Sequence, residues 1–264
     1  MLVVPLGEVL RYVLGDGIGS VALIETYGSD QRIVEAARMS TGKGFLGWRG
    51  CPEHPVGAGE VWPADEPVCP SCGCDVSPGD ERLLRYLWTH RHTTPFEMAG
   101  AIFEIKAPLF VFREWHRHRT QSYNEFSARY AQMPDQHYVP SLERLRAVTT
   151  ANKQAQSVAG PAPDRALGGW RLELQRLQSL VYAHYEEGLT LGVPKEIARV
   201  NTPVARYSTM RVASNLLNWT RFLGLRNHPA AQWEIQQYAI EVARVLRQQF
   251  PRTMALVDER PLSG

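Results

Sequence analysis

One run of fourteen residues, 117–130, constrains this chain more than any other segment. It carries three arginines, a histidine, a glutamate and two serines directly after an apolar segment, and charged groups at this density make poor core material. The guanidinium group of arginine is planar, permanently charged and matched to phosphate and carboxylate oxygens. Serine and asparagine add short neutral hydrogen-bonding groups. The run therefore indicates a binding site for a polyanionic ligand; a solvated, charged helix end is the alternative.

Length and composition exclude some classes of protein. The chain has 264 residues, enough to bury a substantial core as one large domain or two small ones. Its 44% hydrophobic and 21% charged residues are ordinary globular usage. No apolar stretch is long enough to cross a bilayer, and the first residues lack the features of a secretion signal. A net charge of +2 is too small to indicate a general nucleic-acid binder. We expect a cytoplasmic protein with no membrane or nucleic-acid partner.

Hydrophobic periodicity predicts alternating helices and strands. Residues 29–40 begin with cap-type residues and carry apolar positions at helical spacing, which predicts a helix. Another helix is expected from about Asp80. Residues 101–106 alternate like a strand, and Pro108 is expected to open a helix that delivers Arg117 and Arg119 at its C-terminal end. The rest of the chain predicts a polar loop at 150–167, a strand at 206–212, and helices at 168–190, 215–225 and 230–250.

Glycine-rich sequence near the N-terminus only superficially resembles a dinucleotide-binding loop. Residues 15–20 read Gly-Asp-Gly-Ile-Gly-Ser. Such a loop requires a strand before it and a helix after it, and neither is predicted convincingly here. The segment is therefore not interpreted as a dinucleotide-binding motif.

All cysteines lie in a glycine- and proline-rich segment, residues 43–79. Three of the cysteines and one histidine form two pairs of candidate ligands, each with a two-residue gap and a proline after the first member, as in zinc knuckles. Free or disulfide-paired thiols are the alternative, although a cytoplasm disfavours disulfides. A closed four-ligand zinc site would be structural, ordering a segment with too little apolar content to fold by burial. The preferred ligands are Cys51, His54, Cys69 and Cys72, with Cys74 the alternative to His54.

The run at 117–130 closely resembles the signature of the flavin-dependent thymidylate synthases. That signature is Arg-His-Arg, seven residues and a serine, and it is met here by residues 117–119 and Ser127. Three further segments, in the family's order, look like its flavin-side motif, its second substrate-binding element and its C-terminal catalytic element. They are residues 92–97, 193–199 and 225–236. The resemblance spans about residues 20 to 250, and four ordered motifs are more specific than one.

The resemblance implies a fold and a reaction. We expect the α/β (α+β) class, with a mixed sheet flanked by helices, residues 1–264 forming a single domain with the zinc-binding insert, and a homotetramer whose subunit interfaces build the active sites. The implied reaction is the reductive methylation of dUMP to dTMP, using methylenetetrahydrofolate and NADPH with FAD as redox carrier. Outside the insert the chain has no cysteine to attack the uracil ring. The resemblance implies that polarisation by arginine and hydride from a reduced flavin replace covalent attack.

The family's roles carry over to individual positions of this chain. The candidate catalytic residues are Arg226, Ser127 and His92. Arg226 matches the arginine that favours ionisation of the pyrimidine ring, and His92 matches a histidine near the flavin face, with ordinary packing or hydrogen bonding as its alternative. Ser127 is a possible nucleophile, but no base is evident near it in the sequence, and hydrogen bonding to the nucleotide is the preferred role. The expected flavin contacts are Thr94, Arg117, His118, Arg119, Glu125, Asn215 and Arg221. The expected nucleotide contacts are Glu114, Arg117, Glu125, Ser127, Arg129, Arg199 and Arg226.

Two departures from the family pattern fall near the expected flavin site. Leu217 stands where many relatives place an arginine, and Arg221 where a small polar residue can occur. The contacts to the adenine side of the flavin are therefore expected to be rearranged.

Two other functions fit parts of the same pattern. A family member that methylates another uracil nucleotide, such as UMP, would carry similar motifs because the phosphate and base are shared. A nucleic-acid-binding module that uses the insert and the arginines is the alternative from another class.

Overall fold

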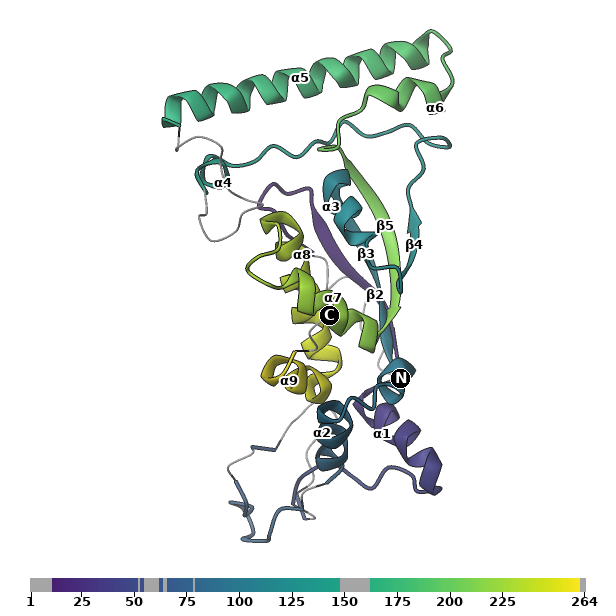
Figure 1. Ribbon diagram of the computed structural model, residues 1–264, viewed down its shortest axis with the longest axis vertical. Helices are drawn as coiled ribbons and strands as arrows, with labels where there is room; N and C mark the ends of the chain where they lie inside the picture. Colours follow the sequence, from purple (N-terminus) through teal and green to yellow (C-terminus); the bar gives the residue numbers. More distant parts are fainter. Residues whose placement is uncertain are drawn as a thin grey trace.

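The computed structural model describes residues 11–51, 53–54, 62–63, 66–77, 79–147 and 162–261. At its centre lies a five-stranded sheet in the order β1-β2-β3-β5-β4 (Figure 1). Its strands, in chain order, are β1 Arg11–Tyr12, β2 Ser20–Tyr27, β3 Gly100–Pro108, β4 Ser122–Glu125 and β5 Tyr207–Asn215. The predicted strands at 101–106 and 206–212 are confirmed as the two long central strands.

Every strand pairing in the described residues is antiparallel. β3 pairs with β5 along its whole length, from Gly100 opposite Asn215 to Pro108 opposite Tyr207. The α+β class with flanking helices is confirmed, but the expected mixture of parallel and antiparallel strands is not found. A parallel pair needs a connection that crosses to the opposite end of the sheet, whereas each connection between neighbouring strands here returns at the end where it left.

The glycine-rich segment at 15–20 forms the turn between β1 and β2. The Asp16 carboxylate accepts hydrogen bonds from the backbone N–H groups of Ile18 and Gly19 at 2.9 and 3.1 Å. Gly15 and Gly17 adopt φ of 72° and 70°, which glycine tolerates without steric cost. A strand rather than a helix follows the turn, as expected for a segment that is no dinucleotide-binding loop.

Helices cover the sheet and extend beyond it at both ends (Figure 1). They are α1 Asp30–Arg38, α2 Glu81–Thr89, α3 Leu109–Trp115, α4 Leu142–Arg146, α5 Asp164–Thr190, α6 Lys195–Ala198, α7 Leu216–Arg226, α8 Trp233–Gln249 and α9 Pro251–Glu259. Short 3₁₀ turns are η1 Met39–Thr41, η2 Thr94–Met98 and η4 Arg199–Asn201. No described helix is long and apolar enough to span a membrane.

Three helix boundaries differ from the sequence prediction. Pro108 is the extended N-cap of α3 rather than its first helical residue, so the helix begins one residue later. α5 begins at Asp164, so residues 164–167 of the predicted loop are helical; residues 150–161 of that loop lie outside the described residues. α8 ends at Gln249 and α9 follows after Phe250.

The main core lies between the sheet and helices α7 and α8. Alternate residues of β3 are buried, and the ring of Phe103 packs edge-to-face on Trp219 with centroids 5.1 Å apart. The Trp219 indole N–H donates to Ala101 O at 3.0 Å, so this large side chain is buried with its polar atom satisfied. The alternation along β3 thus fixes which face of the sheet receives α7, and α7 carries Arg226 at its end.

Helix α5 forms an arm across one end of the molecule (Figure 1). Only Gln178 and Tyr185 of its 27 residues are buried. Large apolar side chains are exposed along it, including Trp170 at 54% and Leu172 at 65%. An exposed apolar surface of this kind is typical of a protein interface.

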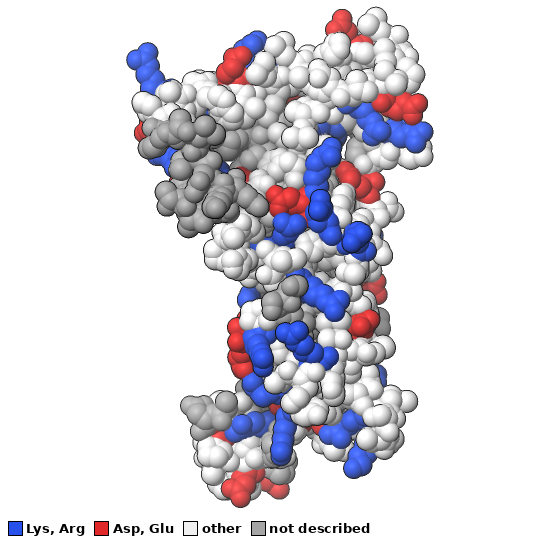
Figure 2. Space-filling view, viewed as in Figure 1, with Lys and Arg blue, Asp and Glu red and all other residues white. Residues whose placement is uncertain are grey.

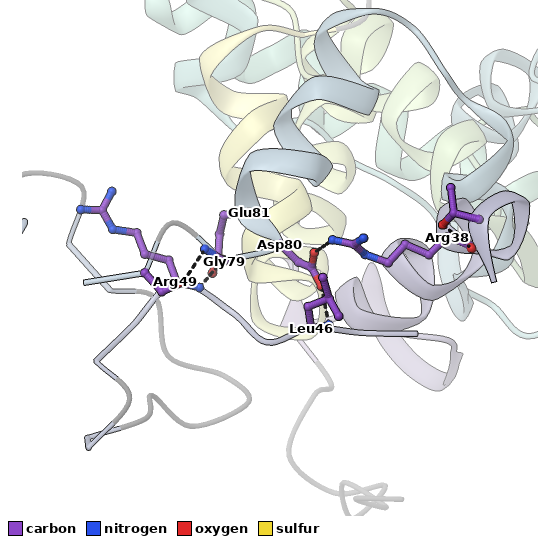
Figure 3. Close-up of polar contacts among 8 residues, drawn as sticks. Arg38, Leu46, Arg49, Gly79, Asp80 and Glu81 are labelled. Atoms are coloured by element: carbon purple, nitrogen blue, oxygen red, sulfur yellow. Dashed lines mark hydrogen bonds and ion pairs between the residues drawn. The ribbon is translucent and has the colours of Figure 1, made fainter. Parts of the chain in front are cut away.

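Both ends of the cysteine-rich insert are held by the start of α2 (Figure 3). The Asp80 carboxylate accepts from Leu46 N at 2.8 Å and from the Arg38 side chain. The neighbouring Glu81 accepts from Arg49 N and, at 2.8 Å, from Arg252 Nε. Asp80 is buried, so these contacts are shielded from solvent. Both ends of the insert are therefore fixed to the first residues of α2.

We expect Asp80→Ala to lower the free energy of unfolding by about 3 kcal/mol, because it removes one partner of a largely buried ion pair. Urea unfolding of the variant and wild type measures this loss. Asp75→Ala, an exposed aspartate in the same insert, serves as the control and should stay within about 0.5 kcal/mol. Equal stability of both variants would contradict the anchoring role.

Candidate active site and metal centre

Arg226, at the end of α7, is bound by two residues from the end of α3. Its Nη1 donates to Glu114 Oε2 at 2.7 Å and its Nη2 to Glu114 O at 2.9 Å. Its Nε donates to His118 Nε2 at 3.0 Å. These three contacts fix the plane of the guanidinium group, although its partners lie more than a hundred residues away in the sequence. The structure thus brings together three residues that the sequence analysis assigned to the site.

His118 is held neutral by its surroundings. Partial burial, and secondarily the positive charge of Arg226, lower its pKa to about 4. The Nε2 atom can accept a hydrogen bond from Arg226 only while it is unprotonated. At neutral pH the group therefore consists of a cationic Arg226, a carboxylate and a neutral imidazole.

The remainder of the Arg-His-Arg run forms a turn between α3 and β4. Tyr123 OH donates to His118 O at 2.7 Å, and Trp115 Nε1 donates to Gln121 Oε1 at 3.0 Å. These contacts hold the turn while Arg117 and Arg119 are exposed. Within the described residues, neither guanidinium makes a hydrogen bond or ion pair. Both are placed just beyond the C-terminal end of α3, as predicted, and are free to bind an external anion.

A second group surrounds the end of β4. The Glu125 carboxylate accepts from Ser208 Oγ at 2.8 Å and shares a cavity of about 90 Å³ with Arg199. Ser127 lies two residues further on, where its Oγ accepts from Arg129 N at 3.3 Å. Among the described residues no histidine or carboxylate bonds this hydroxyl. The local contacts therefore favour a binding role for Ser127 over that of an activated nucleophile.

Arg129 and Arg221 are occupied by neighbours on the surface. Arg129 Nε donates to Glu196 Oε2 at 3.0 Å, and both side chains are more than half exposed. Arg221 donates to Asn218 Oδ1 at 3.1 Å, and the N–H of Asn218 in turn donates to the side chain of Asn215, which caps α7. Such exposed contacts are weak, so a ligand could displace them.

A cavity of about 500 Å³ lies beside η2. It contains the predicted flavin-side residues His92 and Thr94, with Arg91 beside them. Arg91 has φ of 59°, a left-handed conformation that is uncommon for a residue other than glycine. The volume is within the usual range for sites that bind small molecules or cofactors.

Leu217, the departure from the family pattern, is buried in the main core. It lies one residue inside α7, directly behind the Asn215 cap. An arginine at this position would be buried unless the helix shifted. The packing therefore accounts for the apolar residue.

The three groups make no direct polar contact with one another among the described residues. In the described segments, no hydrogen bond or ion pair joins the Arg226 group, the Glu125 cavity and the His92 cavity. A band of Lys and Arg side chains runs along the middle of the molecule on the face drawn in Figure 2. A positive surface of this kind attracts anionic ligands.

The sequence analysis missed residues that line the cavities. Arg206 and Ser208 face Glu125 from the start of β5, and Ala36 and Met98 line the larger cavity. None belongs to a recognised motif. A lone arginine before a predicted strand carries no local signal of binding.

Four ligand-type side chains converge in the insert. The ligand atoms of Cys51, His54, Cys69 and Cys72 all lie within 4.8 Å of one another. Cys51 Sγ is 3.4 Å from Cys72 Sγ and 3.8 Å from His54 Nδ1, while Cys69 Sγ is 3.6 Å from His54 Nδ1. Tetrahedral zinc with bonds of about 2.3 Å to sulfur and 2.0 Å to nitrogen requires separations of about 3.6–3.8 Å. Cys74 lies outside the four-member group, so the geometry favours His54.

The surroundings of Cys69 favour the thiolate form of its side chain. Burial would raise its pKa, but hydrogen bonds from the backbone of Ser71 and Cys72 and from neighbouring thiols outweigh this and lower the pKa to about 6. The described cysteines are free thiols rather than disulfides. Thiolate is the form that ligates a metal.

Known proteins resemble this chain along most of its length. Residues 22–252 match the family described as thymidylate synthase complementing protein. The flavin-dependent thymidylate synthase of Thermus thermophilus is 36% identical over 246 residues, covering 93% of this chain and 78% of the relative. That of Thermosipho africanus is 34% identical and covers 89% of each chain.

Solved structures of a UMP/dUMP methylase share the fold. The methylase is PolB from Streptomyces cacaoi. Its complex with 5-Br UMP aligns with this chain at a TM-score of 0.72 and 26% identity, covering 93% of this chain and 96% of PolB. Its complex with 5-Br dUMP has a TM-score of 0.69 and 28% identity, covering 91% and 95%.

Proposed function

This chain belongs to the family of flavin-dependent thymidylate synthases, a class of methyltransferases, and we propose that it converts dUMP to dTMP with methylenetetrahydrofolate, NADPH and FAD. The observation that carries this assignment is the fixed position of Arg226. Its guanidinium is held by Glu114 and by a neutral His118. A preorganised cation of this kind stabilises negative charge that develops on a pyrimidine ring without having to reorganise.

The residues fit a flavin nucleotide. The cavity beside η2 supplies His92 and Thr94, and the unpaired Arg117 and Arg119 supply cations for phosphate oxygens. Asn215 caps the start of α7 and Arg221 lies in the middle of the helix, whereas Arg226 is its last residue. When bound, the flavin would supply hydride; the chain's own residues would hold it, orient the nucleotide and polarise the ring.

The lack of direct polar contacts between the three groups in the described residues supports an assembled active site. In the part of the chain that the structure describes, Arg117 and Arg119 have no hydrogen-bond or ion-pair partners, and the apolar side chains of α5 are exposed. Association through α5 would bury these side chains. We therefore propose a homotetramer in which neighbouring subunits complete each site.

The cysteine-rich insert is proposed to bind one structural zinc ion. Its four ligands, Cys51, His54, Cys69 and Cys72, would fill the tetrahedral positions and leave none for substrate or water. Free thiols suit the reducing cytoplasm, which is the proposed location. We assign no nucleic-acid partner to this site.

Two measurements test the assignment. The purified protein should be yellow, with flavin absorbance, and should turn over dUMP. A colourless protein that binds oligonucleotides in a salt-sensitive manner would favour the nucleic-acid module instead. UMP is the second candidate substrate, because the solved structural neighbour is a UMP/dUMP methylase; the ratio of kcat/KM for dUMP and UMP distinguishes the two.

Arg117 and Ser127 should separate the two binding sites. Arg117→Ala is expected to lower the affinity for both flavin and nucleotide by about tenfold or more, because it removes an exposed cation assigned to both ligands. Ser127→Ala should lower the affinity for the nucleotide alone, and the protein should stay yellow because it keeps its flavin. Flavin absorbance and dUMP titration measure the two effects. Complete loss of flavin from folded Ser127→Ala would show this division of roles to be wrong.

A further inference from the structure

Arg206 is a buried cation that the proposed mechanism does not use. It lies directly before β5, where its backbone N–H donates to Pro203 O at 3.1 Å and its carbonyl accepts from Leu109 N at 2.9 Å. A bridge to His137 holds it from a third side. The residue is 4% exposed. Its position is therefore fixed by segments far apart in the sequence.

The Arg206 guanidinium lacks a partner for its buried donor. Its Nε is inaccessible to solvent and, within the described residues, makes no hydrogen bond. Burial lowers the pKa of Arg206, partly offset by Tyr185, Tyr182 and Glu125. A buried donor without a hydrogen-bond partner is destabilising, and the nearby positive charge of Arg199 lowers the pKa of Arg206 further. A ligand with the opposite charge would remove that penalty.

The cavity beside Arg206 has the polarity required by such a ligand. Arg199 and Arg206 line it together with Thr202 and Ser208. The one carboxylate in its lining, Glu125, accepts a hydrogen bond from Ser208. Two guanidinium groups thus face a single carboxylate. A volume of about 90 Å³ accommodates a phosphate-sized group but not an entire nucleotide.

We propose that Arg206, together with Arg199, binds the 5′-phosphate of the uracil nucleotide. The identity of the ligand rests on the proposed function; the anion site rests on the geometry of Arg206 itself. Paired guanidinium groups match the oxygens of a phosphate. The nucleoside would extend from the cavity's open side, so that Arg206 positions the substrate without touching the reacting ring.

The test compares dUMP with deoxyuridine, which lacks the phosphate. Arg206→Gln should raise the Kd of dUMP by roughly ten- to hundredfold, the usual effect of losing a charged hydrogen bond, and leave that of deoxyuridine unchanged. Arg206→Lys should restore part of the affinity. Arg211→Gln, an exposed arginine on the same strand, is the matched control and should bind dUMP like wild type.

Two outcomes would overturn the proposal. One is unchanged dUMP affinity in Arg206→Gln; the other is an equal loss for dUMP and deoxyuridine, which would indicate a merely structural role. If Arg206→Gln does not fold, the dUMP-to-deoxyuridine ratio of Arg206→Lys decides, and a ratio equal to that of wild type contradicts the proposal. Thermal stabilisation by inorganic phosphate is measured in parallel. If phosphate stabilises wild type but not the variant, the anion site is supported even if no uracil nucleotide is turned over. If phosphate stabilises neither protein and dUMP does not bind, the anion site is contradicted.

Discussion

Arg226→Ala is expected to lower dTMP formation at least a hundredfold while the protein retains its flavin. Removal of one preorganised donor from a developing negative charge costs about 3 kcal/mol in the transition state. The contacts with Glu114 and His118 make Arg226 such a donor, because they fix its orientation before substrate binds. Single-turnover formation of dTMP measures the chemical step, and the visible spectrum reports the flavin.

The control for this variant is Arg247→Ala. Arg247 lies on α8 and pairs with Asp258 at the surface, so its loss should change activity little. Circular dichroism checks that both variants are folded. Turnover by Arg226→Ala within a few-fold of wild type would remove Arg226 from the catalytic role.

Replacement of Cys69 and Cys72 by serine is expected to release one zinc ion per chain and to open residues 43–79 to protease. Zinc contributes on the order of 10 kcal/mol to the folding of small zinc-binding peptides, which is far more than this glycine- and proline-rich segment gains by burial. The protein should retain its flavin, because the hydrogen bonds of Asp80 and Glu81 that anchor the insert do not involve the substituted cysteines. Elemental analysis of protein purified without added metal gives the stoichiometry.

Cys74→Ser provides the matched control for the metal site. Cys74 lies beside Cys72 but outside the convergent group, so this variant should retain zinc. Wild-type protein without zinc would contradict the metal assignment. A metal-free double variant whose insert resists protease as well as wild type would contradict its structural role.

Local pattern predicted the elements better than their arrangement. The alternation of β3 and the apolar spacing of α7 are visible in the sequence because each buries one face. The direction of the strands depends on where each connection returns to the sheet, which no window of sequence contains. The antiparallel sheet was therefore predicted wrongly as mixed.

The site shows the same division. Resemblance to the family singled out Glu114, His118 and Arg226 individually, but their hydrogen bonds join residues over a hundred positions apart. Arg206 had no motif at all, because its burial and its missing partner exist only in the folded chain. The four proposed zinc ligands could be identified from the sequence because their spacing is local within each pair.

The most direct test of the account is transfer of the labelled methylene carbon of methylenetetrahydrofolate to dUMP by the purified protein with NADPH and FAD. The account predicts labelled dTMP that forms only when dUMP, NADPH and flavin are all present. Absence of labelled dTMP from a folded protein with bound flavin, with all components supplied, would contradict it.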